Sequence, residues 1–374
     1  MKRVMFVLAM LVAWAGLSAD GEALVQQDGG VVAAAPGDQA EDAAGVGQPP
    51  PQPPRQPPPP PPPPLPPDNR PRRVGSMVGY VDDAIIESQV RVRFEVGLGN
   101  HTPDRAEFFY AKCGCYRDLA GTQFFDPNAP GPGPDVLDDL DFRQVMVEGE
   151  YAVNRRFAVF GEIPLRWIQP QHFATRPNGD PPVGFGDQGG FGDLRAGAKL
   201  ALAVSPDYIL TFRFQAYFPT GSASKGLGTD HASVEPSLLY FQKFPNTSDR
   251  LALESQLGFW LPTGGSDGPR PATDDDYSGN VLFYGIGPSY VVYDHNGVRI
   301  APVVELFGWR VFSGFEAPPG TTSTDASGTN IVNLKFGARF NFQARSSMYV
   351  GYGHALTSES WYDDIVRVEY RYTF

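Results

Sequence analysis

Charged side chains recur at every second position in many segments of this 374-residue chain. In the first such segment, Arg91, Arg93 and Glu95 alternate with Val92 and Phe94. Successive side chains of a β-strand point to opposite faces, so the charges of such a segment share one face. Beside Glu95, the same alternation assigns sixteen candidate residues to that face: Arg91, Arg93, Glu148, Glu150, Glu162, Arg195, Lys199, Arg213, Glu235, Glu254, Glu305, Lys335, Arg339, Arg367, Glu369 and Arg371.

Two interpretations of this charged face are open. If the face lines a water-filled passage, acidic and basic side chains on different segments create a transverse field, which selects small charged or dipolar solutes. If the passage is narrow, the same side chains pair with one another and only fill and stabilise the interior.

The segments that carry these charges are long enough to cross a membrane as strands. Their alternation runs for nine or more residues, which matches the ~9–11 residues of a transmembrane β-strand. Bacterial outer-membrane barrels have an even number of such strands. Twelve segments show the pattern, near 89–98, 142–153, 157–168, 193–204, 208–218, 232–243, 250–261, 281–293, 298–311, 331–342, 347–356 and 364–374.

The connections between the segments are short and long in turn. The short ones are 154–156, 205–207, 244–249, 294–297 and 343–346, and the long ones are 99–141, 169–192, 219–231, 262–280, 312–330 and 357–363. Short periplasmic turns and long surface loops are typical of outer-membrane barrels. A lipid-facing Arg or Lys near the midplane costs about 2–4 kcal/mol, so the charged face must line the lumen. We therefore predict an all-β fold, a transmembrane antiparallel up-and-down β-barrel of about 12 strands.

The N-terminal part differs from the rest in composition. Residues 1–23 have a basic start, an apolar run and small residues, which together indicate a secretory signal peptide. Residues 24–74 include eight consecutive prolines, from Pro57 to Pro64, and are predicted to be a disordered, proline-rich periplasmic spacer. The spacer is a simple disordered tail, an arm that reaches across the periplasm to the cell wall, or a ligand for a peptide-binding domain. The barrel is assigned to residues 75–374.

Composition and the C-terminus narrow the location and the partners. The net charge of −12 argues against nucleic acid, and the mean hydropathy of −0.26 argues against a helical membrane bundle. The chain ends in Tyr370, Tyr372 and Phe374 at alternate positions, which resembles the signal that barrel-assembly machinery recognises. We expect the outer membrane of a diderm bacterium, with outer-membrane lipid, this machinery and a small-molecule solute as partners.

The first long loop carries two further candidates. Residues 102–104 read Thr-Pro-Asp, which predicts a helix start, and a short helix over 102–118 could rest in the lumen or remain a surface loop. Cys113 and Cys115 could form a disulfide after export. The resulting ring is tight and strained, so a labile bond or free thiols are alternatives.

Catalysis and cofactors are not expected. His354 lies near Ser358 and Ser360, but no nucleophile motif surrounds these serines. A pair of cysteines without further soft ligands does not make a metal site. We therefore predict no catalytic residue, no metal and no other cofactor.

Three short segments resemble the outer-membrane barrel family that is linked to meta-pathway phenol degradation. They read Phe-Gly-Asp-Leu at 191–194, Phe-Pro-Thr-Gly at 218–221 and Leu-Pro-Thr-Gly at 261–264. The resemblance covers about 150–374 and implies uptake of small molecules, aromatic compounds among them, but it supplies no site residues. The long first loop and the proline tract depart from the family's pattern.

These observations predict a channel or transporter that passes small molecules, aromatic or hydrophobic ones included, through a charged barrel lumen. The alternative is a closed structural or surface-exposed barrel whose proline-rich arm contacts the cell wall. A continuous polar lumen favours the first function, and a lumen sealed by paired charges favours the second.

Overall fold

A computed structural model describes residues 76–101, 137–173, 179, 181–182, 184–229, 231–263, 278–316, 324–342 and 345–374. The predicted signal peptide, the proline-rich spacer, the helix over 102–118 and the pair Cys113 and Cys115 lie outside these residues. No helix among the described residues is long and apolar enough to span a membrane.

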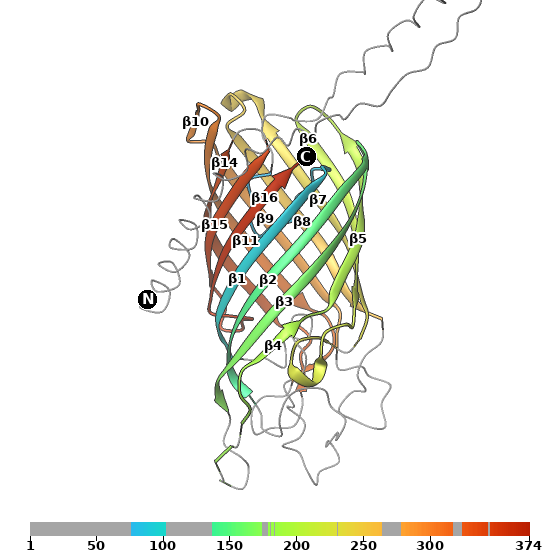
Figure 1. Cartoon of the computed structure of the whole chain (residues 1–374), viewed down its shortest axis with the longest axis vertical. Helices are drawn as coiled ribbons and strands as arrows, with labels where there is room; N and C mark the ends of the chain where they lie inside the picture. Colours follow the sequence, from blue (N-terminus) through green and yellow to red (C-terminus); the bar gives the residue numbers. More distant parts are fainter. Residues whose placement is uncertain are drawn as a thin grey trace, which may run out of the picture. The chain divides into compact units, whose positions relative to one another are not determined.

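Twelve long strands form a closed antiparallel barrel, as predicted (Figure 1). Each pairs with the next along the chain, and the last pairs with the first. This is the architecture of bacterial outer-membrane barrels. The strands are β1 (Gln89–Asn100), β2 (Leu137–Asn154), β3 (Phe157–Phe173), β5 (Leu194–Val204), β6 (Tyr208–Phe218), β7 (Ser233–Phe244), β8 (Leu251–Pro262), β9 (Val281–Tyr290), β11 (Val298–Val311), β14 (Asn330–Phe342), β15 (Ser346–Ala355) and β16 (Asp364–Thr373).

Several short elements accompany the twelve long strands. They are β4 (Gln188–Phe191) on β3, β10 (Tyr293–His295) on β11, the pair β12 (Phe315–Glu316) and β13 (Thr324–Asp325), and the single turns η2 (Ala223–Lys225) and η3 (Pro245–Thr247). The segment predicted as one strand over 281–293 is split into β9 and β10. At the split, two consecutive amides bond to opposite neighbours. The Val291 amide donates to the carbonyl oxygen of Arg250, which precedes β8, and the Val292 amide donates to that of Ile300 on β11.

The short turns gather at one end of the barrel, and the strand ends between which the long connections run lie at the other (Figure 1). At the short-turn end, β10 and β11 are joined through Asn296 and Gly297, whose φ angles are 52° and 76°. Positive φ at both positions is typical of the tight hairpin turns whose twist matches the strands. The C-terminus lies at this same end. β2 and β3 extend further toward the long-loop end than predicted, because they continue to pair with each other as far as Leu137 and Phe173.

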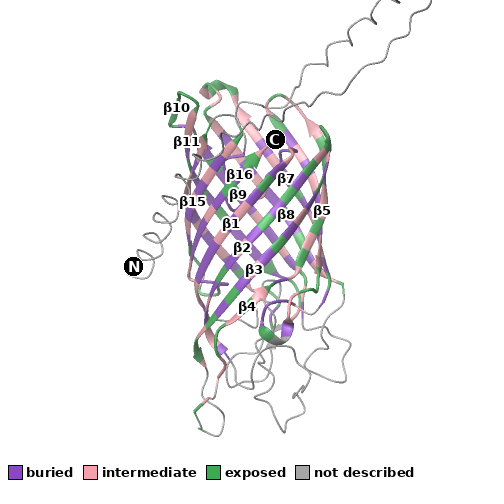
Figure 2. Ribbon diagram, in the orientation of Figure 1, coloured by how far each residue is buried: buried purple, intermediate pink, exposed green. Residues whose placement is uncertain are grey.

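The two faces of the wall differ in burial (Figure 2). On the outer face, Leu238 and Leu257 are paired across β7 and β8 and are 43% and 49% exposed. Phe336 is similarly exposed on β14. Polar and charged side chains at the alternate positions are buried instead. This distribution suits a barrel whose outer surface is covered by lipid.

Residues 76–88, here called the strap, run inside the barrel before β1 begins. Met77, Val78, Ile85 and Ile86 are at most 3% exposed. The strap leaves the lumen at the short-turn end, where the Phe374 amide donates to the Ser88 carbonyl oxygen at 3.1 Å. A segment inside the lumen was considered only for the first long loop, over 102–118, and the strap was not predicted. Residues 76–88 were simply counted as the start of the barrel.

Candidate functional site

The charged residues predicted for the lumen face lie on the inner side of the wall. Fifteen of the sixteen candidates are buried, and Arg195 is half-buried. Their burial in a barrel of this kind means that they face the lumen and its contents rather than lipid.

Most of these charges pair with one another. The paired atoms lie 2.8 Å apart for Arg195 and Glu162, for Lys199 and Glu150, and for Arg339 and Glu369. Further pairs join Arg91 to Glu148 at 2.5 Å, Arg213 to Glu235 at 2.6 Å, Arg371 to Glu369 at 3.1 Å, Arg93 to Glu162 and Arg367 to Glu95. Charge neutralisation across neighbouring strands is therefore extensive within the described lumen.

Two of the acidic candidates bind the strap instead of a basic side chain. Glu305 of β11 accepts hydrogen bonds from the amides of Gly79, Tyr80 and Val81 at 3.2, 2.9 and 2.8 Å. It also accepts one from the hydroxyl of Tyr349 at 3.0 Å. Hydrogen bonds to an ionised carboxylate are stronger than those between neutral groups. Glu305 is thus the main anchor of the strap's innermost turn.

Glu254 of β8 anchors the strap's first residues in the same manner. Its Oε1 accepts the Met77 amide at 2.8 Å. On the opposite side of this segment, Arg339 donates to the carbonyl oxygens of Met77 and Val78 at 3.2 and 2.5 Å. The strap backbone is therefore held between a carboxylate and a guanidinium, and neither group depends on the strap's side chains.

Two aspartates bind the remainder of the strap to the wall. Asp82 lies 3.3 Å from Arg213, and Asp83 lies 2.9 Å from Arg371. The Thr211 hydroxyl donates to the Ala84 carbonyl oxygen at 2.6 Å. These partners lie on the short-turn halves of β6 and β16, so the strap fills that half of the lumen.

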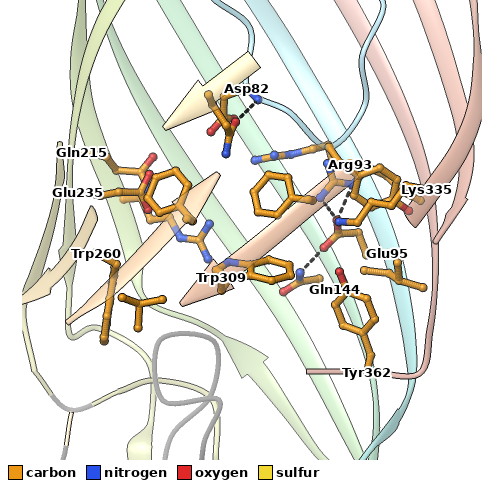
Figure 3. A pocket seen from close by; sticks show the side chains of 18 of the residues that line it. Asp82, Arg93, Glu95, Gln144, Gln215, Glu235, Trp260, Trp309, Lys335 and Tyr362 are labelled. Atoms are coloured by element: carbon orange, nitrogen blue, oxygen red, sulfur yellow. Dashed lines mark hydrogen bonds and ion pairs between the residues drawn. The ribbon is translucent and has the colours of Figure 1, made fainter. Parts of the chain in front are cut away.

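A cavity of about 140 Å³ lies between the strap and the long-loop end (Figure 3). Tyr80 and Asp82 of the strap line it, and Asp82 lies on the side opposite Trp260 and Tyr362 (Figure 3). Trp309 also lines it, near the end of β11. Five basic and three acidic side chains also line it: Arg93, Arg195, Arg213, Lys335 and Arg367, with Asp82, Glu95 and Glu235. We refer to this cavity as the chamber.

The aromatic lining of the chamber was not predicted, because only the charged residues of the inward face were considered. Phe307 and Trp309 follow Glu305 at every second position of β11, so the same alternation places them in the lumen. Their rings lie 4.7 Å apart between centroids. Tyr362, in the connection before β16, also lines the chamber, and burial raises the pKa of its hydroxyl above the usual range. It is therefore a neutral hydrogen-bonding group there.

The remaining candidates lie away from the chamber. Tyr370, Tyr372 and Phe374 are exposed on the outer side of the barrel's last strand and its end, by 47%, 39% and 63%. His354 is exposed, and its Nδ1 lies 2.8 Å from Asp364 rather than from a serine. Within the described ranges, no group of three or more His, Cys, Asp or Glu residues is placed to hold a metal ion.

Comparison with solved structures finds outer-membrane barrels at low sequence identity. The COG4313 outer membrane channel from Pseudomonas putida F1 is 14% identical with a TM-score of 0.49, over 79% of this chain and 99% of that one. The NanC porin is 7% identical with a TM-score of 0.42, over 76% and 100%. The translocator domain of the autotransporter NalP from Neisseria meningitidis is 11% identical with a TM-score of 0.40, over 77% and 88%. No curated protein matches the chain significantly.

A family model described as "Putative MetA-pathway of phenol degradation" matches residues 142–363. The matched region runs from within β2 to the connection before β16, and it includes all three segments on which the resemblance was based. It spans more than half of the 374 residues. The chain therefore belongs to this family of barrels linked to phenol degradation.

Proposed function

We propose that the protein is an outer-membrane channel that passes small molecules through its lumen, and that the strap closes the channel at rest. The observation that carries this proposal is that a single chain segment, the strap, obstructs the lumen. A single chain segment, held largely through its backbone by lumen carboxylates and guanidinium groups, occupies the short-turn half, and a polar and aromatic chamber remains beyond it. A segment of this kind can leave without unfolding the wall.

The family described as linked to phenol degradation supports solutes that include aromatic compounds, and the aromatic lining of the chamber agrees with this class. In the orientation that outer-membrane barrels adopt, the long loops face outward and the short turns face the periplasm. The strap would then close the periplasmic half, and the residues before it would lie in the periplasm. Outer-membrane lipid and the barrel-assembly machinery, which would recognise Tyr370, Tyr372 and Phe374, are the partners this location requires.

The second candidate function is a closed structural barrel whose proline-rich arm contacts the cell wall. The extensive pairing of lumen charges favours it, because a network of this kind stabilises a filled interior without any need for passage.

Planar-bilayer recording separates the two functions. The refolded full chain is compared with a variant that lacks residues 76–86 and with Glu305→Gln, after each is shown to be folded by its heat-dependent gel mobility. A channel predicts low or intermittent conductance for the full chain and a larger, steady conductance for both variants. If all three proteins are folded and none conducts, the channel proposal is wrong and the closed barrel stands.

A further inference from the structure

We propose that the chamber is a binding site for a single-ring aromatic carboxylate, with Lys335 as the group that binds the carboxylate. This inference deepens the proposed function, on which it rests for a route into the chamber. It assigns a ligand class to one half of the lumen and a role to one lysine.

Lys335 is a buried ammonium group without a carboxylate partner among the described residues. It is 3% exposed, and it lines the chamber. The other four basic side chains of the lining each have at least one such partner: Arg93 and Arg195 share Glu162, Arg213 pairs with Asp82 and Glu235, and Arg367 pairs with Glu95. Among the described basic residues of the lining, Lys335 is therefore the one that no carboxylate neutralises, and its amino group remains available to an anion.

The nearby carboxylates have other donors. Glu95 accepts hydrogen bonds from Gln144 and Arg367. Glu305 is occupied by three strap amides and the Tyr349 hydroxyl. Neither lies within ion-pair distance of the lysine. A buried charge is favoured when it is paired, so an incoming anion would supply what the lumen wall does not.

Four aromatic rings surround the ammonium group. Nζ of Lys335 lies 3.8 Å from the ring centroid of Tyr80, 4.8 Å from that of Phe307, 5.6 Å from that of Trp309 and 5.8 Å from that of Tyr362. The simplest explanation of this arrangement is that the cation–π contacts alone stabilise the buried lysine and hold Tyr80 of the strap in place. Rings around a cation also suit a ligand that places a carboxylate beside the cation and its own ring against the aromatic wall.

The size and charge of the chamber restrict the ligand further. A dry cavity of roughly 150 Å³ binds benzene in an engineered protein, so a volume of about 140 Å³ has room for one six-membered ring. Because carboxylates pair with the other four basic groups of the lining, the unpaired Lys335 favours an anion over a neutral ring or a cation. A small anion without a ring would leave the aromatic wall unused.

Binding to the full chain in detergent micelles tests this assignment by titration calorimetry, with tryptophan fluorescence as a second readout because Trp260 and Trp309 line the chamber. The probes are benzoate, its neutral counterpart benzamide, and acetate and phosphate as anions without a ring. We expect benzoate to bind at least tenfold more tightly than the other three. Equal binding of benzamide and benzoate, or of acetate and benzoate, would overturn the proposal.

Variants identify the lysine. Lys335→Met should weaken benzoate binding at least tenfold, and Lys335→Arg should restore most of it. Lys243→Met is the matched control, because Lys243 is paired with Asp207 and Asp249 at the short-turn end, away from the chamber. Phe307→Ala should reduce the preference for benzoate over acetate. If folded Lys335→Met binds benzoate as the unmodified chain does, the lysine has only the packing role and the proposal fails.

Bilayer recording tests the channel function separately from the binding site. A chain that conducts but does not bind benzoate refutes the site and leaves the channel proposal intact. A chain that binds benzoate through Lys335 but never conducts, even without the strap, supports the site and refutes the channel.

Discussion

Glu305→Gln should release the strap from the lumen. The carboxylate accepts the Tyr80 and Val81 amides on Oε1, and the Gly79 amide and Tyr349 hydroxyl on Oε2. A glutamine retains one acceptor oxygen and replaces the other with an NH2 group. In place of Oε1 that group cannot accept from the Tyr80 and Val81 amides, and in place of Oε2 it cannot accept from the Gly79 amide, although the Tyr349 hydroxyl can rotate to accept from it. The remaining bonds lose the assistance of the negative charge.

The size of the effect follows from these bonds. A hydrogen bond to a charged group contributes about 1.5–3 kcal/mol net of exchange with water. Only three of the four donors belong to the strap, so loss of one or two of these bonds weakens docking by about 1.5–6 kcal/mol. Since about 1.4 kcal/mol is a factor of ten in an equilibrium constant, the equilibrium constant for docking should fall by roughly 10- to 10⁴-fold. Hydrogen-bond contributions net of exchange with water are the right ones to use, because water hydrates Glu305 once the strap leaves.

Chymotrypsin cleavage after Tyr80 provides the assay, because this tyrosine is 7% exposed when the strap is docked. We expect cleavage in Glu305→Gln to be faster by a factor in that range, together with increased conductance. Glu162→Gln is the matched control. Glu162 is equally buried, and its partners Arg93 and Arg195 belong to the wall. If the strap in Glu305→Gln resists chymotrypsin as well as it does in the control, Glu305 is not the anchor.

Three further changes test the wall and the strap. In Gly79→Ala, the added Cβ would overlap the ring of Tyr349, so we expect a displaced strap and faster chymotrypsin cleavage. Lys199→Met leaves Glu150 buried without its cation and should lower the free energy of unfolding in urea by about 3–5 kcal/mol. Leu257→Arg puts a charge on the lipid-facing side of β8 and should reduce the unfolding free energy in lipid vesicles by about 2–4 kcal/mol.

Each of these has a control of the same chemistry. A Cβ at Gly149 meets nothing within 4 Å, so Gly149→Ala should leave chymotrypsin cleavage unchanged. Lys243 lies at the short-turn end with partly exposed partners, so Lys243→Met should change stability by about 1 kcal/mol or less. Leu257→Met keeps an apolar group toward lipid and should be tolerated. Equal effects in a variant and its control would contradict the reasoning for that pair.

The strands of the barrel wall could be predicted because each depends on alternation between neighbouring positions in the sequence. Alternation at positions such as 90–98 sets a strand, and the sorting of short and long connections closes the sheet. The same alternation indicated which charged residues share a face. It could not indicate which acid meets which base, because that depends on the stagger between neighbouring strands. Glu162, for example, contacts Arg195 on β5 and also Arg93, which lies two strands away on β1.

The strap could not be predicted for the opposite reason. Its residues carry no long alternation, and their hydrogen bonds join positions far apart in the chain, such as the Gly79 amide and Glu305, which are separated by 226 residues. Backbone amides are present in every sequence, so a carboxylate that binds them leaves no pattern to recognise. The chamber was missed for a simpler reason, since Phe307 and Trp309 lie at inward positions that were considered only for charge.

The path of the strap also constrains the order in which the protein can assemble. Its partners lie on β6, β8, β11, β14 and β16, and the seam where β1 pairs with β16 joins residues more than 260 positions apart. Contacts of such long sequence separation form late, because the loop entropy must be lost before they are gained. A half-built sheet therefore offers the strap only part of its binding surface. The last residue, bonded to Ser88, completes the seam at the point where the strap ends. Docking of the strap is thus a final step, and it marks a barrel that has finished folding.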